Sequence, residues 1–378
     1  MKDTFVVEQK PFISILSSMQ PICSKRTTVA TTNYILFQLG HKELVLKCTD
    51  LEISLQCSYT PKELHVGEPR SILVFGKRIF DLVKELEGDI TCTITNNQLL
   101  LKSGSVNLAL NISDAQEFPP FPERIENLMQ IDSPFLLEML NKVAFLIPQN
   151  NSNPALNGLF LEISKQELKM TTTDGHCLAQ ITTPKYTLEE DKKWLVPRRA
   201  IFEVKKFLET SKNETTFLGV CGNQMVFSGE SFNFFTKLLV DQFPQYDSIL
   251  TRDGFLAARV DKNHLVKTLR RSSCLLSGQF IATRFLFNQN VVNVSMQNND
   301  VGTLEEEVPL TEFKGDEVDI RFYAPYLLNG LQAFSQDSLL TFYLKTASKP
   351  VIFESYKEDT HLLYLVMPVS PTTPQTET

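Results

Sequence analysis

The sequence lacks the features that mark membrane, secreted and metal-binding proteins. Its 378 residues hold no run of about 18 uncharged apolar residues, the length that a membrane span requires. The N-terminus, Met1-Lys2-Asp3, carries an acidic residue early and is not followed by an apolar core of the signal-peptide type. The seven cysteines are odd in number and show no CxxC spacing, which argues against a disulfide framework or a zinc site. We therefore expect a cytoplasmic protein, nucleoid-associated if DNA is its partner, with no metal and no cofactor.

Motifs of the common enzyme classes are also missing. There is no P-loop, no GxGxxG and no GxSxG, and the five histidines form no HExxH pair. Asp50 with Glu52, and Asp174 with His176, lie two residues apart and would share a face of a strand, so a carboxylate-dependent nuclease is the enzymatic alternative. The other interpretation is that each aspartate fixes a turn by bonding to nearby backbone. Because the aspartate recurs along the chain, we favour the turn and expect no catalytic residue.

The charge balance does not favour a nucleic-acid-binding protein. The chain has 37 basic and 44 acidic residues, a net charge of −7. If DNA is a partner, the basic side chains must be gathered on one surface while the remaining surface is acidic.

Internal repetition is the most informative feature that the sequence does contain. TDLEISL opens at Thr49 and TDGHCLA opens at Thr173, so that Asp174 lies 124 residues after Asp50. A weaker match, NNDVGTL, places Asp300 another 126 residues along. A Phe-Pro pair at 118–119 recurs 125 residues later, and Met-Pro follows after another 124. Since a third of the chain is 126 residues, we expect three domains: 1–126, 127–254 and 255–378.

Hydrophobic periodicity predicts the elements of each repeat. The first repeat has expected helices at 8–20 and 76–87, strands at 33–39 and 43–59, and a hairpin-like segment at 90–112. In the second, Ser133-Pro134 is expected to open a helix that carries Leu136, Leu140, Val143 and Ile147, and a further helix starts at Pro197. The third has expected helices near 261–276 and 324–335. Two helices against a largely antiparallel sheet, three times over, make an α+β fold. The polar tail, 370–378, is expected to be disordered.

Basic residues recur on two of the expected helices. On the helix after Pro197, two pairs of basic residues seven apart form one stripe, opposite an apolar one, and Lys267, Arg270 and Arg271 cluster near 261–276. Such a stripe is more often a solvated face than a binding site. Its recurrence in an acidic chain nevertheless favours contacts with DNA phosphates, which position a protein without reading sequence. The candidate DNA-contacting residues are Arg26, Lys77, Arg78, Asn150, Arg198, Arg199, Lys205 and Lys206.

Over nearly its whole length the sequence resembles the beta subunit of bacterial DNA polymerase III, the beta sliding clamp. The resemblance is carried by TDLEISL, by LNGLFLEI with TDGHCLA, by VPRRAIFEV, by KLLVDQFPQY and by the late YLVMPV. It implies a non-catalytic processivity factor: a head-to-tail homodimeric ring around duplex DNA, with helices lining the hole. Implied partners are double-stranded DNA, the polymerase III alpha subunit, a clamp loader, and other polymerases and repair proteins that carry clamp-binding peptides.

The resemblance also assigns two surfaces to this chain. A hydrophobic cleft for partner peptides would be formed by Leu156, Thr173, Gly175, His176, Leu178, Pro244, Ile249, Tyr326, Leu365, Val366, Met367 and Pro368. The dimer interface would join Leu108 and Leu110 of one chain to Leu275 and Leu276 of the other. For several of these residues, among them Leu178 and Val366, the competing interpretation is an ordinary core position.

This chain departs from the family pattern around the expected cleft. Cys177 stands where the family typically has arginine, and Ser248 replaces another basic residue. The segment 153–155 lacks the usual basic and aromatic residues, and the sequence runs past the usual ending as MPVSPTTPQTET. We therefore expect apolar anchors to provide most of the peptide affinity. A divergent adaptor that kept the fold but lost its loading partners is the second alternative.

Overall fold

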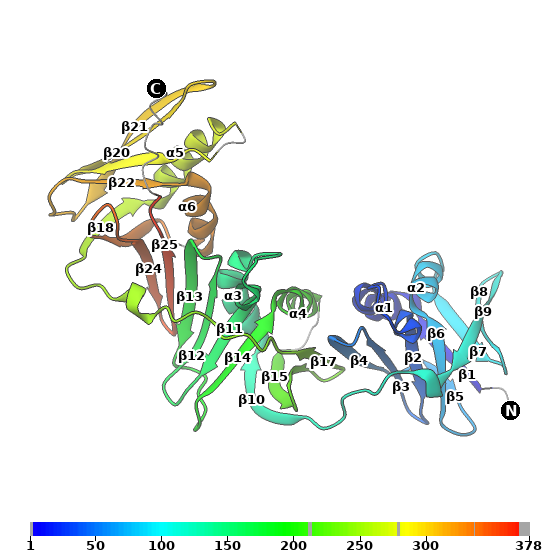
Figure 1. Cartoon of the computed structure of the whole chain (residues 1–378). Helices are drawn as coiled ribbons and strands as arrows, with labels where there is room; N and C mark the ends of the chain where they lie inside the picture. The colour runs from blue at the N-terminus through cyan, green and yellow to red at the C-terminus, as the bar shows by residue number, and fades with distance from the viewer. Residues whose placement is uncertain (1–2, 211–213, 278–279, 336, 370–378) are drawn as a thin grey trace. The chain divides into compact units, whose positions relative to one another are not determined.

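The structure is a computed structural model that describes residues 3–210, 214–277, 280–335 and 337–369. Contacts divide the chain into two compact units, which are described separately (Figure 1). The first unit comprises Met1–Leu136 and Phe202–Leu238, and the second comprises Leu137–Ile201 and Leu239–Thr378. The expected tail at 370–378 lies outside the described residues.

One pattern of elements, a strand, a helix and three strands, occurs twice in every repeat. In the first repeat it runs through β1 (Asp3–Glu8), α1 (Gln9–Cys23), β2 (Tyr34–Leu39), β3 (Leu44–Thr49) and β4 (Ile53–Tyr59). After the short β5 (Glu63–His65) it runs again through β6 (Arg70–Phe75), α2 (Gly76–Lys84), β7 (Asp89–Ile94), β8 (Gln98–Ser103) and β9 (Val106–Asp114).

The central repeat follows the same order. Its first half is β10 (Glu126–Asp132), α3 (Ser133–Val143), β11 (Gly158–Ile163), β12 (Leu168–Thr173) and β13 (Cys177–Thr183). Its second half is β14 (Lys192–Pro197), α4 (Arg198–Thr210), β15 (Thr215–Cys221), β16 (Gln224–Ser228) and β17 (Phe232–Lys237).

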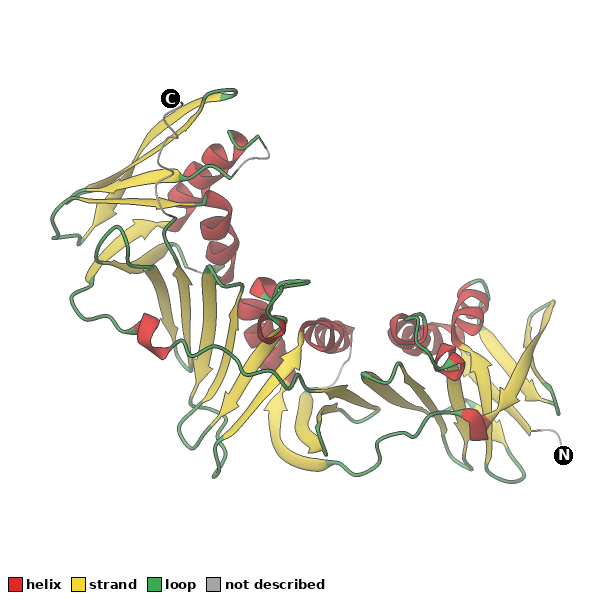
Figure 2. Cartoon of the chain, in the orientation of Figure 1, coloured by secondary structure: helices red, strands yellow, loops and turns green. Residues whose placement is uncertain are grey.

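The third repeat again has both halves. The first is β18 (Leu256–Asp261), α5 (Lys262–Cys274), β19 (Thr283–Phe287), β20 (Val291–Asn298) and β21 (Gly302–Thr311). The second is β22 (Val318–Phe322), α6 (Ala324–Leu331), β23 (Leu339–Leu344), β24 (Val351–Lys357) and β25 (Thr360–Val366). Figure 2 shows helices and strands in all parts of the chain. Because every strand pairing is antiparallel among the described residues and the helices lie on one face of the sheets, the fold is α+β.

Each unit contains one long antiparallel sheet that crosses from one repeat to the next. In the first unit the order is β10-β15-β16-β17-β4-β3-β2-β6-β9-β8-β7-β1-β5. In the second unit it is β14-β11-β12-β13-β25-β24-β23-β18-β21-β20-β19-β22. The strands of the central repeat are therefore shared between the two sheets, which is why contacts yield two units although the pattern repeats three times. The division at 126 and 254 stays a prediction.

Helices cover one face of each sheet and bury an apolar stripe there. In the first unit α1 packs beside α2, and Phe12, Leu16 and Met19 of α1 are fully buried against the sheet (Figure 1). In the second unit α5 packs beside α6, and the Asp261 carboxylate caps α5 by accepting the backbone N–H of His264 at 2.7 Å.

Three local expectations need correction. The expected strand at 43–59 is two strands, because Leu51 lies in a turn with a φ of 76° instead of continuing the alternation. The segment 90–112 is three strands, since β8 lies between the two that were expected. The cap of α3 is Asp132, whose carboxylate accepts the N–H of Phe135 at 2.8 Å. The hydroxyl of Ser133, the expected cap, instead shares a hydrogen bond of 2.7 Å with Thr216.

Among the described residues, no helix is both long enough and apolar enough to cross a lipid bilayer.

Candidate functional site

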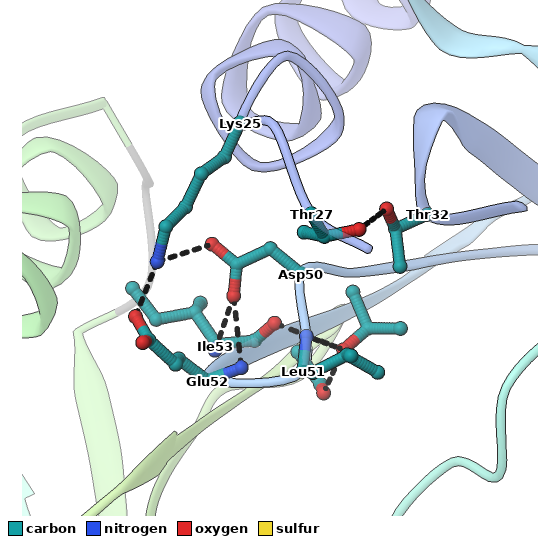
Figure 3. A network of polar contacts seen from close by, with 9 residues as sticks. Lys25, Thr27, Thr32, Asp50, Leu51, Glu52 and Ile53 are labelled. Carbon is teal, nitrogen blue, oxygen red and sulfur yellow. Dashed lines mark hydrogen bonds and ion pairs between the residues drawn. The ribbon is translucent and has the colours of Figure 1, made fainter. Parts of the chain in front are cut away.

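The Thr-Asp step of the first repeat forms a closed turn between β3 and β4 (Figure 3). The Asp50 carboxylate accepts the backbone N–H groups of Glu52 at 2.9 Å and Ile53 at 2.8 Å. The Thr49 hydroxyl donates to the carbonyl of Ile53 at 3.1 Å. Lys25 forms ion pairs with both Asp50 and Glu52, so these carboxylates are engaged within the fold.

The second Thr-Asp step has the same geometry between β12 and β13. The Asp174 carboxylate accepts the N–H groups of His176 at 2.8 Å and Cys177 at 2.7 Å. The Thr173 hydroxyl donates to the carbonyl of Cys177 at 2.6 Å. Each aspartate therefore uses one oxygen to hold two backbone amides, as the turn interpretation predicts. In the described part of the chain, no three His, Cys, Asp or Glu side chains are grouped so that they could hold a metal ion.

The third repeat places a different residue at this turn. β20 ends at Asn298 and β21 begins at Gly302, so Asn298 occupies the position of Thr49 and Thr173. Asp300 therefore lies one place beyond the position of Asp50, and its expected equivalence is wrong by one residue. The Asn298 side chain instead accepts the N–H of Asp300 at 3.0 Å and donates to the carbonyl of Leu275 at 2.6 Å.

The second Thr-Asp turn adjoins an apolar cluster in the second unit. β13 pairs with β25 so that Leu178 lies opposite Leu365, and both belong to one buried cluster against which Met367 packs. The backbone N–H of Met367 donates to the carbonyl of His176 at 2.9 Å, which extends the pairing beyond β25. The structure thus brings together three residues of the expected cleft. Leu178 and Leu365 are 2% and 1% exposed, which makes them core side chains; that they also form the floor of a cleft stays a prediction.

Polar and aromatic groups border the same turn. Gly175 has a φ of 95°, and a Cβ built on it would lie 3.8 Å from a methyl of Leu156. The ring of the exposed His176 stacks on Tyr326 of α6 with centroids 5.4 Å apart. Gly175 therefore adjoins Leu156, and His176 adjoins Tyr326; that these residues line one cleft stays a prediction.

A connecting segment, residues 239–255, carries two further residues of the expected cleft. We call it the strap. Pro244 and Ile249 are exposed on it, and Phe243 and Tyr246 beside them belong to the buried cluster. Phe243 stacks on Phe160 of β11 with centroids 4.8 Å apart. The strap thus contacts the apolar cluster through Phe243 and Tyr246, while Pro244 and Ile249 are exposed.

One expected cleft residue, Val366, lies on the other face of the sheet together with Cys177. Successive side chains of β25 point to opposite faces of the sheet, so the side chain of Val366 points away from the face that carries Leu365. Val366 pairs with Cys177. Val366 is fully buried, which is the core interpretation. Cys177 is 1% exposed and its burial raises the pKa of the thiol to about 12, so this position is not at the rim of the cleft. Pro368 is half-buried beyond the end of β25.

Two polar anchors of the strap have no counterpart among the expected residues. The Tyr246 hydroxyl donates to Glu162 at 2.7 Å and accepts from Thr171 at 3.2 Å. Arg252 binds both oxygens of Glu354, which is only 3% exposed. A buried glutamate requires such a partner, but no periodicity in the sequence signals it, because the two residues are 102 apart.

The expected DNA-contacting residues have unequal surroundings. In the first unit Arg26, Lys77 and Arg78 are exposed, and Asn150 is exposed in the second. The others lie on α4: Arg198 donates from Nε to the carbonyl of Ile147 at 2.9 Å, Lys205 lies over the Phe202 ring, and Lys206 pairs with Glu203. Arg199 is half-buried.

Two basic residues on the helices, Arg198 and Arg271, make contacts that stabilise the fold. Arg198 fixes the start of α4 through its backbone contact. On α5, Arg271 is bound to Glu306 of β21 and His264 lies near the same carboxylate, whereas Arg270 is exposed.

The residues of the expected dimer interface lie at strand and helix ends. Leu108 and Leu110 are half-buried on β9, and Leu275 and Leu276 are half-buried just after α5. They are neither core nor fully exposed side chains, so their surfaces could still be covered by a second chain.

Comparison with known proteins places every repeat in one family. Profiles of the N-terminal, central and C-terminal domains of the DNA polymerase III beta subunit match residues 3–122, 130–245 and 248–370. The beta sliding clamp of Pseudomonas aeruginosa is 25% identical over 369 residues, covering 97% of this chain and 99% of that protein. The beta sliding clamp of Staphylococcus aureus strain Mu50 is 24% identical, with 97% and 98% covered.

Solved structures agree with this fold. The crystal structure of the DNA polymerase sliding clamp from Bacillus subtilis has a TM-score of 0.89 at 21% identity, covering 98% of this chain and 100% of that one. A sliding clamp from Pseudomonas aeruginosa bound to griselimycin has a TM-score of 0.89 at 23% identity, with 98% and 100% covered. With three consecutive domain profiles matched along almost its whole length, the chain belongs to the DNA polymerase III beta subunit family, the bacterial beta sliding clamps.

Proposed function

We propose that this chain is the non-catalytic processivity subunit of a replicative polymerase, a ring that encircles duplex DNA and tethers its partners. Family membership over all three domains carries the proposal. The structure adds physical support for three steps: closing the ring, contacting DNA and holding a partner peptide.

The way in which the repeats join suggests how two chains would close a ring. In the first unit β4 pairs with β17, and in the second unit β13 pairs with β25. In both cases the last strand of a first half-repeat pairs with the last strand of the following repeat. In the third repeat the last strand of the first half is β21. The repeat that follows it would be the first repeat of a second copy, whose last strand is β9. A head-to-tail dimer follows, with two such junctions.

Both selected strands have an edge available for pairing. Val106–Asn111 of β9 pair with β8, whereas Ile112–Asp114 pair with β6. Gly302–Pro309 of β21 pair with β20, and only Leu310 and Thr311 reach β18. Within the described residues the other side of each segment has no strand neighbour. An unpaired edge of this length is a template for another strand.

The apolar side chains at these edges fit the same junction. Leu108 and Leu110 share one face of β9, and Leu275 lies beside the turn that leads into β21 through its bond to Asn298. Burying four leucine side chains would contribute several kcal/mol, at about 1.5–3 kcal/mol for each full burial. Replacing Leu275 and Leu276 with aspartate should therefore yield a folded monomer, measured by analytical ultracentrifugation and circular dichroism. An unchanged dimer would reject this junction.

DNA would meet the helices through phosphate contacts. Arg26, Lys77 and Arg78 supply exposed charge in the first repeat. In the third repeat a groove between α5 and α6 has Lys262 and Arg270 in its lining beside apolar residues such as Val266 and Leu328, although α6 itself has no basic residue. Groups of this kind hold the backbone and do not read bases. Lasting attachment would then come from the closed ring.

Retention on circular DNA tests that mechanism. A clamp loader with ATP should place the protein on a nicked circle, where it stays in moderate salt and is released when the circle is cut. Release by cutting supports encirclement. Equal retention on the cut and the uncut circle would show ordinary contacts and reject the ring. Failure to load, combined with binding of a partner peptide, would favour the divergent adaptor.

The cleft beside the second Thr-Asp turn would hold a partner peptide such as that of the polymerase alpha subunit. Its floor would be the buried Leu178 and Leu365, with the half-buried Met367 and the exposed His176 and Ile249 at its border. An aliphatic floor with a few polar groups suits a peptide with one or two apolar anchors. Because Cys177 contributes no charge, binding should depend weakly on salt.

A labelled peptide of the QLxLF type tests the cleft. Met367→Ala combined with His176→Ala should weaken binding at least tenfold, because both side chains are accessible and neither is core. Leu178→Ala is less suitable, since a cavity in the buried cluster costs about 2–5 kcal/mol of stability. Tyr356→Ala, at a position 68% exposed on β24, is the matched control. Equal binding by all three proteins would place the partner site elsewhere.

A further inference from the structure

The core of the third repeat encloses a small cavity. It has a volume of about 20 Å³ and lies within the second unit. Each of the strands β18 to β24 contributes at least one side chain to its wall, and both helices complete the wall, with Leu265 of α5 and Leu327 of α6. No lining residue is more than 5% exposed. The cavity is therefore an internal feature of this repeat and not a surface groove.

The shapes of the lining side chains account for the unfilled space. Five of the eleven lining residues are phenylalanines, whose rings are rigid and planar. Phe285 meets Phe322 edge to face with centroids 5.6 Å apart. Phe342 lies tilted to both Phe287, at 5.8 Å, and Phe353, at 5.6 Å. Rings that meet at such angles leave a gap between them, and the other six lining residues, all valine or leucine, do not fill it.

The lining of the cavity makes it unsuitable for water. A buried water molecule needs a volume of about 10–15 Å³ and several polar partners. The volume is sufficient, but every lining side chain is a hydrocarbon, and no polar atom of the described residues that form the wall faces the space. A water molecule would lose its hydrogen bonds there without replacement, which is why apolar cavities of this kind stay dry.

An apolar particle meets no such penalty in the cavity. The lining atoms of a void lack van der Waals partners on one side, and a particle that fits restores these contacts without needing a hydrogen bond. The volume limits the occupant to a single large atom such as xenon, or to a molecule of roughly two or three heavy atoms such as a short alkane. Because the wall is buried on all sides, the occupant enters when the repeat opens transiently.

We propose that the core of the third repeat is a binding site for one small apolar molecule. The site shares no residue with the expected cleft, the candidate DNA-contacting residues or the expected dimer interface, so it does not depend on the proposed function. Because both helices and the strands β18 to β24 line it, the bound molecule contacts nearly every element of the repeat. A ligand that binds only the folded chain shifts the unfolding equilibrium toward the folded state. Occupation of the cavity therefore stabilises the third repeat.

Xenon is the probe for this site, because it is apolar, spherical and chemically inert. The full chain is prepared with isotope-labelled valine and leucine methyl groups, and methyl NMR spectra are recorded at increasing xenon pressure. The methyl resonances of Val260, Leu265, Val292 and Leu327 should shift along a saturating curve. Those of Leu16, which is fully buried in the core of the first unit, should stay in place. If the resonances of the lining residues move no more than those of Leu16, the proposal is overturned.

Filling the cavity distinguishes this site from any other place where xenon binds. Val292→Ile and Val260→Ile each add one methylene group to the wall, from two different strands, and each should abolish the xenon-induced shifts of Leu265 and Leu327. Val291→Ile is the matched control, because it adds the same group on the opposite face of β20, at a half-buried position, and should leave the shifts unchanged. Circular dichroism identifies the variants that fold. Shifts that persist in a folded filling variant would place the xenon elsewhere and reject the cavity as its site.

Discussion

At the scale of single residues, the two Thr-Asp turns show how one short motif can serve as a structural device rather than a catalytic one. In each turn a carboxylate holds two backbone N–H groups and a threonine hydroxyl holds the returning carbonyl. The turn needs a positive φ at its third residue, and the chain meets this need with Leu51 at 76° and with Gly175 at 95°. Glycine tolerates that conformation freely and leucine does not. The second turn is thus the less strained, and it is the one that borders the expected cleft.

Gly330 is a residue at which the structure predicts a large effect. A Cβ at this position of α6 would overlap the ring of Tyr364, which is fully buried and bonded to Tyr326. Alanine would favour the helix by about 1 kcal/mol, but forcing extra atoms into a packed core typically costs about 1–3 kcal/mol. Gly330→Ala should therefore lower the free energy of unfolding and, by displacing Tyr326, also weaken peptide binding.

Asn329→Ala is the matched control, because this neighbouring side chain is exposed on the same helix. Urea denaturation should give a lower midpoint for the glycine variant alone. Equal midpoints for both variants would mean that the ring of Tyr364 can move aside, and that it does not hold Tyr326 rigidly.

At the scale of elements, periodicity in the sequence was sufficient to locate the helices but not to separate neighbouring strands. The apolar stripes of α1, α2, α5 and α6 were predicted correctly to within a few residues, since a helix buries one continuous face. The strand expected at 43–59 is two strands, because the alternation through Leu51 continues across a turn whose φ the sequence does not reveal. Strand β8 was missed for a different reason, because its consecutive Leu99, Leu100 and Leu101 do not alternate with polar residues. Periodicity of two has no signal for a reversal of direction.

The site was predictable only in part, and the reason is again local. His176, Leu178 and Met367 are brought together as the family resemblance implies. The register of β25 decides to which face of the sheet the side chain of Val366 points, and the sequence does not specify this register by itself. The anchor between Arg252 and Glu354 joins residues far apart in the chain, so only the folded structure reveals it.

Strand β21 is held to helix α5 by a carboxylate, which makes its attachment dependent on pH. Burial alone would raise the pKa of Glu306, but hydrogen bonds from Arg271 and Thr268, with His264 nearby, hold it below the ordinary value of 4.5. A carboxyl group whose pKa is lowered by folding stabilises the protein above the unfolded pKa and loses this effect as the pH falls through the folded one. Glu306→Gln should therefore be less stable than the parent at pH 7.

The difference between parent and Glu306→Gln should shrink as the pH falls below about 4.5. Thermal unfolding at a series of pH values measures it, with Glu305→Gln as the control, since this exposed neighbour points to the other face of the strand. A constant difference at all pH values would show that the variant acts through packing and not through the ion pair.

At the scale of the whole molecule, one repeating pattern explains both the continuous sheets and the proposed ring. A strand at the end of each first half-repeat is completed by the repeat that follows, within the first unit by β4 and β17 and within the second by β13 and β25. A chain of three repeats leaves one such strand at each end of the series, β9 and β21. Two copies would satisfy both strands, and the exposed basic residues of the helices would then have to attract DNA to a chain whose net charge is −7.

Charge reversal tests whether binding to DNA depends on where the basic residues lie or only on the net charge of the protein. Lys77→Glu and Arg78→Glu change two exposed residues of α2 and Arg26→Glu changes one shortly after α1, whereas Lys42→Glu, Lys314→Glu and Lys349→Glu change three exposed residues in turns and loops. The net charge of the two variants is the same. If helix residues bind phosphates, the first variant should load on nicked circles less well and show a shallower salt dependence, by about 0.9 in slope for each phosphate that is no longer neutralised.

Both variants should remain dimers by ultracentrifugation, and cutting the circle should release each of them. An equal loss of loading in the two variants would show that only the overall charge matters, and the helices would then not be the surface that faces DNA.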